Sequence, residues 1–223
     1  MKKRIATLLL LLQGCADITP ITDRRAYGPV ITLKDWFTSS HLLSYSGGAV
    51  LFDAGFRPTV LETALAEEGI APDDVTHIFL THGHGDHVGG LELFPDALLL
   101  GMSEEANLIE EETSGSRSLD VCLADGARYT FDDTVVEAIA APGHTPGNAV
   151  YLVDHTLLLG DTGLITASGA LTPVAEKRSD DPDGAAEALR TLATTLSDRR
   201  IDWIVPSHSD GVEGFQALVE YAE

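Results

Sequence analysis

Cysteine and positive charge are both scarce in this sequence. Only two of the 223 residues are cysteine, which excludes a disulfide-stabilised scaffold or a cysteine-rich zinc module. Lysine and arginine number 14 against 35 aspartates and glutamates, so the formal net charge is -21. This charge disfavours nucleic acid and anionic lipid headgroups as partners, because phosphate binding requires a basic face. The 44% hydrophobic content and the length indicate one globular domain.

The start of the chain has no apolar run long enough to span a bilayer as a helix. A basic end followed by a short apolar run over residues 5–12 predicts a secretory signal peptide over residues 1–14. The segment Leu12-Gln13-Gly14-Cys15 resembles a bacterial lipoprotein signal, in which the cysteine becomes the lipidated first residue. A plain signal peptide or an apolar N-terminus without that role is the alternative.

The lipoprotein resemblance implies a lipid anchor at Cys15, followed by a tether over residues 15–28 that lacks periodicity. It implies a location in the cell envelope of a bacterium, with the outer membrane or the periplasmic side favoured. The folded domain is then expected over residues 29–223.

Hydrophobic periodicity predicts that strands and helices alternate along this domain. Several strands are near-continuous apolar runs, as in sheets covered on both faces. The expected strands are Val30–Leu33, His41–Tyr45, Ala49–Asp53, Thr76–Thr81, Ala97–Leu100, Val135–Ala140, Ala149–Val153, Thr156–Leu159 and Ile201–Val205. The expected helices are Thr59–Glu68, Ser103–Glu112, Gly184–Leu196 and residues 215–222. The pattern predicts an α/β domain with sheets inside and helices outside.

Five of the eight histidines stand in loops that directly follow predicted strands. The densest group is Thr81-His82-Gly83-His84-Gly85-Asp86-His87, where two glycines free the backbone after a strand. These side chains cannot all point one way on a helix or a strand, but on a tight loop they can converge. Imidazole nitrogens with a carboxylate are the donors that a zinc-like ion prefers. The loop is therefore a predicted metal site.

Three weaker signals follow along the chain, each at a predicted strand end. His144 lies between Pro142-Gly143 and Pro146-Gly147, Asp161 follows a strand directly, and His208 follows the last strand. A single histidine after a strand is usually a surface residue, and an Asp-Thr-Gly turn is usually only a turn. In this order, and together with the first group, they form one constellation.

That constellation resembles the metal-ligand set of the metallo-beta-lactamase superfamily, with similarity over residues 30–223. The resemblance implies an αββα four-layer sandwich of the metallo-beta-lactamase type, with metals at one edge of the two sheets. The implied ligands are His82, His84 and His144 for one ion, and Asp86, His87 and His208 for the second. Asp161 would bridge both ions, and Asp53 would orient the 82–87 loop without binding metal.

Two zinc ions, with iron or manganese as substitutes, would lower the pKa of a shared water towards about 7. The resulting hydroxide would attack a carbonyl or phosphoryl centre, and Asp86 would align it or carry a proton as a catalytic residue. The sequence has no Gly-x-Ser-x-Gly elbow to supply a protein nucleophile. We therefore expect a hydrolase acting on an ester, thioester, lactone or similar bond of a small molecule.

Branches of the superfamily differ at single positions. His84 stands where flavodiiron proteins carry glutamate, and true beta-lactamases lack the bridging Asp161. The chain ends soon after His208 and lacks the aromatic residue that follows this position in glyoxalase II, which disfavours a glutathione thioester. The acidic charge disfavours the RNA-processing branch.

Two other functions remain as alternatives. Persulfide dioxygenases bind a single iron through positions that match His82, His144 and Asp161. A catalytically idle zinc-binding lipoprotein is the third candidate, although idle members usually lose ligands.

Several other residues have a structural interpretation beside a functional one. Trp36 and Phe37 form either an apolar substrate wall or an ordinary strand edge. Cys122 is expected to be a small buried hydrophobe, and Glu104–Glu112 a solvated helix face. The histidines expected to have only packing or surface roles are His41, His77 and His155.

The lipid anchor is tested by Cys15→Ala in a bacterial host. The substitution removes the acceptor thiol, so the protein should leave the membrane fraction while its domain remains folded. Fractionation with immunodetection, together with circular dichroism of the released protein, measures both effects. Retention of the variant in membranes would contradict the anchor.

Overall fold

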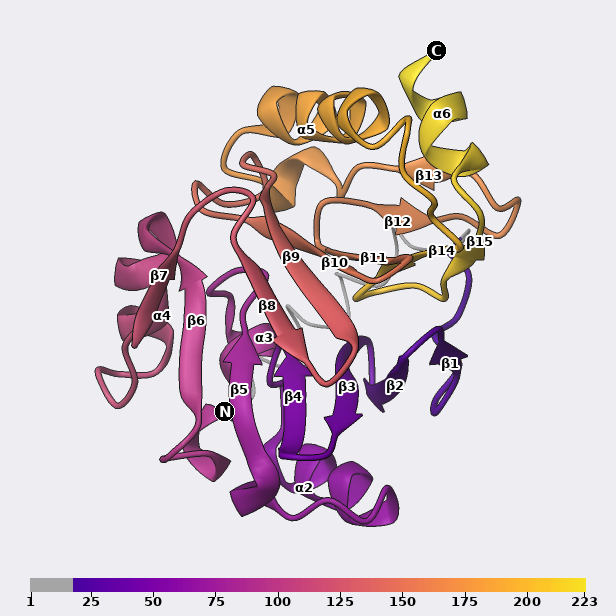
Figure 1. Cartoon of the computed structure of the whole chain (residues 1–223). Coiled ribbons are helices and arrows are strands. Elements are labelled where there is room, and N and C mark those ends of the chain that lie inside the picture. The colour runs from indigo at the N-terminus through magenta and orange to yellow at the C-terminus, as the bar shows by residue number, and fades with distance from the viewer. Residues whose placement is uncertain (1–17) are drawn as a thin grey trace.

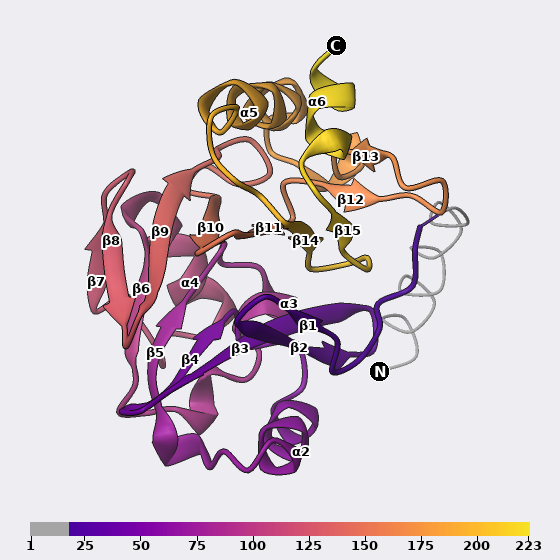
Figure 2. The same cartoon turned by 45° about the vertical axis from the view of Figure 1, so that its right-hand side comes forward.

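A computed structural model describes residues 18–223, which form four layers (Figures 1 and 2). Two sheets pack face to face, and helices cover the outer face of each. This is the αββα sandwich predicted from the sequence. The predicted signal peptide and Cys15 lie outside the described residues.

The first sheet has seven strands in the order β1 to β7. They are β1 (Ala26–Tyr27), β2 (Val30–Asp35), β3 (Thr38–Tyr45), β4 (Gly48–Phe52), β5 (Val75–Phe79), β6 (Leu98–Met102) and β7 (Val121–Leu123). Pairing is antiparallel from β1 to β4 and parallel from β4 to β7. Because parallel strands end at one edge of a sheet, the loops after β4 and β5 emerge together.

The second sheet has six strands in the order β15-β14-β11-β10-β9-β8. They are β8 (Arg128–Phe131), β9 (Thr134–Ala140), β10 (Ala149–Val153), β11 (Thr156–Gly160), β14 (Trp203–Pro206) and β15 (Val212–Glu213). β10 is antiparallel to both β9 and β11, whereas β11 is parallel to β14. The ends of β9, β11 and β14 therefore share one edge. A separate hairpin consists of β12 (Leu164–Ile165) and β13 (Leu171–Thr172).

Helices lie on the two outer faces. Those of the first sheet's side are α2 (Pro58–Glu67), α3 (Gly85–Val88) and α4 (Ala106–Glu112), and those of the second are α5 (Pro182–Thr195) and α6 (Gln216–Ala222). Short 3-10 turns are η2 (Pro72–Asp74), η3 (Leu91–Leu93), η4 (Ser103–Glu105) and η5 (Glu176–Arg178). Figure 2 shows α5 and α6 on one side of the sandwich and α2 on the other.

Three apolar clusters join the layers. The cluster between the sheets includes Phe52, Phe79 and Tyr151, whose ring centroids lie 5.4 to 5.6 Å apart. A second cluster lies beneath α2, and a third beneath α5 and α6. Burial of each large apolar side chain stabilises the fold by about 1.5–3 kcal/mol. The loops at the sheet edge therefore rest on a closely packed frame.

The expected strands and helices are present, with ends that differ by no more than three residues. β5 ends at Phe79 rather than Thr81 because the Thr81 N–H donates to the side chain of Asp53. The helix expected over Ser103–Glu112 begins as a 3-10 turn. The strands that periodicity misses have only two to four residues, too few to show a period of two.

The first described residues pack against the domain. Ile18 pairs with Thr166, and the buried Tyr27 donates its hydroxyl hydrogen bond to Asp210. The sequence predicts a tether as far as residue 28, but residues 18–28 are part of the packed structure. The irregular composition of this segment conceals its pairing with two distant elements.

Cys122 is exposed, contrary to the burial expected from its apolar neighbours. β7 is an edge strand, and side chains alternate between the faces of a strand. Leu123 occupies the inward position, so Cys122 points outward.

No helix within residues 18–223 is long and apolar enough to cross a membrane.

The loop that carries His144 rests on the start of α5. The backbone N–H groups of Asp180 and Asp181 donate to the carbonyls of His144 and Gly143, at 3.0 and 2.9 Å. Gly143 has φ +138°, and a Cβ atom there would overlap the backbone of Ala185. Only glycine fits this contact.

Gly143→Ala should lower the free energy of unfolding by about 3 kcal/mol or more, through backbone strain and overlap with α5. Urea denaturation followed by circular dichroism measures the change. Gly169→Ala is the matched control, because Gly169 has φ +85° but open space around a Cβ atom. We expect a loss of about 1 kcal/mol for the control. Equal losses would contradict the contact.

Candidate metal centre

The predicted ligands converge at the edge where strand ends of both sheets meet. His82 and His84 follow β5, and α3 carries Asp86 and His87. In the second sheet, the loops after β9, β11 and β14 carry His144, Asp161 and His208, respectively. The structure thus brings together all seven predicted residues: His82, His84, Asp86, His87, His144, Asp161 and His208.

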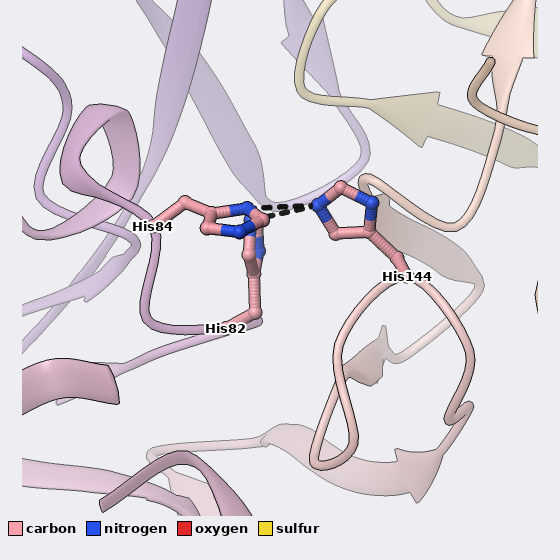
Figure 3. A group of neighbouring side chains, drawn as sticks. All are labelled: His82, His84 and His144. Carbon is pink, nitrogen blue, oxygen red and sulfur yellow. Dashed lines mark hydrogen bonds between the residues drawn. The ribbon is translucent and has the colours of Figure 1, made fainter. Parts of the chain in front are cut away.

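His82, His84 and His144 form an imidazole triad (Figure 3). The Nε2 atom of His144 lies 3.0 Å from Nδ1 of His84 and 3.2 Å from Nε2 of His82. Tetrahedral zinc with Zn–N bonds of about 2.0–2.1 Å separates its nitrogen ligands by roughly 3.3 Å. The spacing of the triad is close to that value.

Asp86, His87 and His208 form a second group. The Nε2 atom of His208 lies 3.3 Å from Oδ2 of Asp86, and Nε2 of His87 lies 3.8 Å from the same oxygen. These donors come from α3 and from the loop after β14. One carboxylate and two imidazoles therefore face one another across the two sheets.

Asp161 lies between the two groups. Its Oδ2 is 3.0 Å from Nε2 of His208 and 3.5 Å from Nε2 of His144, and its Oδ1 is 3.3 Å from Nε2 of His87. Nε2 of His87 and Oδ1 of Asp161 are buried without a hydrogen-bond partner. Buried polar atoms are costly when unpaired, and bound metal would satisfy these atoms. The donor set therefore fits two ions, with Asp161 placed to reach both.

Asp53 contacts His87 on the side of its ring that faces away from the metal centre. Its buried carboxylate accepts the N–H of Thr81 at 2.7 Å and the Thr81 hydroxyl at 2.8 Å. Nδ1 of His87 lies 2.7 Å from Asp53 Oδ2, which leaves Nε2 facing the centre. Such contacts fix the tautomer and the direction of a ligating imidazole. Asp53 itself belongs to none of the candidate ligand groups.

The β2–β3 hairpin holds His208. The Nδ1–H of His208 donates to the carbonyl oxygen of Phe37 at 2.8 Å, and the two rings stack with centroids 5.7 Å apart. This contact directs Nε2 towards Asp86 and Asp161. The hairpin turn thus contributes directly to the geometry of one predicted ligand.

A family model described as metallo-beta-lactamase superfamily matches residues 33–208. The chain belongs to the metallo-beta-lactamase superfamily. Members of this superfamily are mostly hydrolases, and the histidine and aspartate cluster is compatible with metal binding.

Curated relatives include metallo-beta-lactamase domain-containing protein 1 of Homo sapiens. It is 32% identical over 225 residues, covering 91% of this chain and 80% of the relative. Hydroxyacylglutathione hydrolase of Anaeromyxobacter dehalogenans is 35% identical over 145 residues, covering 64% of this chain. The aligned part spans 49% of the length of that hydrolase.

Solved structures share the fold at lower sequence identity. A metallo-beta-lactamase from Pontibacter korlensis aligns with a TM-score of 0.73 at 20% identity, covering 89% of this chain and 95% of the other. A B3 metallo-beta-lactamase with an active-site glutamic acid aligns with a TM-score of 0.68 at 18% identity. That alignment covers 92% of this chain and 87% of the other. These likenesses show the metallo-beta-lactamase fold.

Burial favours the neutral form of two of the triad imidazoles, His82 and His144. Desolvation lowers the pKa of His144 to about 4 and that of His82 well below its ordinary value. Neutral imidazole is the form that binds metal. His82 and His144 are therefore ready to bind metal without losing protons.

In the second group, the pKa values of the two histidines shift in the opposite direction. Burial alone would lower the pKa values of His87 and His208, but the neighbouring carboxylates together outweigh it: Asp161 and Asp86 act on both histidines, and Asp53 acts on His87. Both pKa values are therefore raised. Burial would raise the pKa of Asp161, but the facing His208 and His87 hold it well below its ordinary value. Metal must displace protons from this group.

Aromatic side chains line the rim beside His208. Trp36 and Phe56 are 48% and 38% exposed, and Phe37 lies between them with centroid distances of 5.2 and 5.6 Å. Trp36 and Phe37 were expected as a substrate wall or a strand edge. Phe56 joins them from the loop after β4, a contact that no local sequence pattern indicates.

Glu105 was expected on a solvated helix face, but it is 1% exposed. Its carboxylate accepts backbone N–H groups from two ligand loops. Its acidic neighbours conceal this burial in the sequence.

The remaining histidines belong to none of the candidate ligand groups: His41 is buried, His77 packs against Phe131, and His155 is exposed.

Zinc titration at pH 6 and pH 8 tests the two groups. A raised pKa keeps a proton on His87 and His208 near neutral pH, so zinc affinity of their group should rise as pH rises. The expected gain is about tenfold per pH unit for each displaced proton, whereas His82 and His144 are already neutral and add no such dependence. Metal analysis after desalting should give about one ion per chain at pH 6 and about two at pH 8. Identical pH profiles for both ions would contradict this difference.

Proposed function

We propose that this protein is a dinuclear metal-dependent hydrolase that cleaves an ester, thioester, lactone or similar bond in a small molecule. The observation that carries the proposal is the position of Asp161, within 3.5 Å of imidazoles from both ligand groups. Zinc suits these nitrogen and oxygen donors, and iron or manganese could occupy the same positions.

The roles of the residues follow from their contacts. The triad would hold one ion, the second group would hold the other, and Asp161 would contact both. Two such ions, when bound, supply hydroxide at neutral pH and polarise the scissile group. Asp86 is the candidate catalytic residue, because its Oδ2 lies beside His208 and its side chain is only half-buried. It is placed to align the attacking water or to carry its proton.

The rim favours a substrate with an apolar portion. The exposed rings of Trp36 and Phe56 offer contact area beside His208. Arg57 lies 6.0 Å from the Trp36 ring, but its guanidinium is already paired with Asp35. The net charge of -21 disfavours polyanionic substrates and nucleic acid. An uncharged ester, lactone or acyl thioester fits these conditions.

The similarity to hydroxyacylglutathione hydrolases adds support for thioester hydrolysis. The hydrolase of Anaeromyxobacter dehalogenans is about twice as long as the part that aligns with this chain, since the match covers 49% of it. A glutathione thioester is therefore one member of the substrate series to be tested. We further propose that the enzyme is anchored through Cys15 at the periplasmic or outer-membrane side of a bacterial envelope.

The test is a hydrolysis assay on lactones, acyl thioesters and phosphoesters with zinc, manganese or iron restored to the metal-free protein. We expect hydrolysis that requires two ions per chain and survives removal of iron. A single iron with oxygen uptake on glutathione persulfide would overturn the proposal in favour of a dioxygenase. Full zinc loading without turnover of any substrate would instead indicate an idle zinc protein.

Asp161→Ala should reduce binding of both ions and lower hydrolysis by more than about 100-fold, because its carboxylate reaches both groups. Metal analysis and initial rates measure the two effects. His155→Ala is the matched control, since His155 is exposed. Loss of only one ion from Asp161→Ala would show that the bridging assignment is wrong.

A further inference from the structure

Glu105 is a buried carboxylate that the roles described above leave unused. It ends η4, directly before α4, and is almost completely shielded from solvent. Burial of a carboxylate is costly unless hydrogen bonds compensate its charge. Its two recorded bonds come from backbone N–H groups rather than from a lysine or an arginine.

The two bonds join loops from different sheets. Oε2 accepts the N–H of Gly83 at 2.7 Å, between His82 and His84. Oε1 accepts the N–H of Gly147 at 2.7 Å, three residues beyond His144. Each oxygen therefore holds one of the two segments that supply the imidazole triad. Charge-assisted bonds of this length are about twice as strong as neutral ones.

The local sequence is adapted to this contact. Glu105 occupies the position preceding α4, yet its side chain does not cap that helix. At Gly147 a Cβ atom would lie 2.9 Å from Glu105, and at Gly83 it would lie 3.0 Å from the backbone nitrogen of Ile109. The glycines beside the histidines thus let both loops approach the carboxylate and α4.

We propose that Glu105 is a positioning residue that sets the spacing of the His82, His84 and His144 imidazoles for one metal ion. It acts through the backbone of two loops, one from each sheet. The inference rests on the proposed metal site, which it deepens by naming a support for the triad that makes no contact with the second group. Asp53 contacts His87 of the second group directly and also holds Thr81, next to His82. The two hydrogen bonds of Glu105 reach only the segments that carry the triad.

Glutamine is the informative replacement. It has the same shape but only one acceptor oxygen, so Glu105→Gln can retain one N–H bond and places its own NH2 against the other. One loop then loses its support. We expect zinc affinity of the triad to fall by about 10- to 100-fold, as for other residues that hold metal ligands in place.

The two ligand groups can be separated by background variants. His208→Ala removes a ligand of the second group and leaves the triad, whereas His84→Ala does the reverse. Glu105→Gln should weaken zinc binding in the His208→Ala background and leave it unchanged in the His84→Ala background. Chelator competition measures the affinities, and cobalt absorption spectra show any change in the geometry of the retained site.

Asp35→Asn is the matched control. Asp35 is also buried and accepts two backbone N–H groups, from Phe56 and Arg57, but that segment carries no predicted ligand. The control should lower thermal stability without changing triad affinity. If Glu105→Gln does not fold, Glu105→Asp replaces it, because its shorter side chain cannot reach both loops.

The outcomes separate this inference from the proposed function. A wild-type protein that binds no metal would overturn both. Wild-type binding of two ions with unchanged triad affinity in Glu105→Gln would overturn only the role of Glu105. Equal weakening in both backgrounds, or failure of both Glu105 variants to fold, would show a general structural role and also overturn it.

Discussion

The buried carboxylate of Asp161 lies within 3.5 Å of imidazoles from three separate segments: helix α3 and the loops after β9 and β14. A carboxylate withdrawn from water needs hydrogen-bond donors or positive charge nearby. Protons on His87 and His208 can supply part of that charge, and divalent ions would supply more. The rest of the sheet edge is arranged so that these groups meet and keep their orientation.

That arrangement depends on supports that are themselves buried. Asp53 holds His87, Phe37 holds His208, and Glu105 holds the segments that carry the triad. The start of α5 receives the His144 loop through the carbonyl of Gly143. Ligands on loops would lose rotational order without such contacts. Each support comes from an element other than the one that carries its ligand.

Much of the fold and the convergence of the candidate ligands could be predicted from the sequence. Strong apolar runs such as β10 and β11 are visible because buried strands need them. The His82–His87 loop is visible because its donors are adjacent in sequence.

Other features depend on contacts between distant residues, which one sequence does not display. Glu105 is surrounded by exposed acids, and only the return of the 147 segment shows that it is buried. Cys122 has apolar neighbours but lies on an edge strand, and residues 18–28 pair with elements more than 100 positions away. Phe56 joins the aromatic rim only because the β4 loop folds back towards the β2–β3 hairpin.

The division of the ligands between two sheets also constrains how the protein is made. During synthesis, the segment with His82 to His87 emerges well before His144, Asp161 and His208. Neither candidate ligand group is complete within the first sheet, so tight metal capture has to wait until the second sheet has docked. Metal binding at this site would then be linked to the last folding step, and it would stabilise only chains whose two halves have joined correctly.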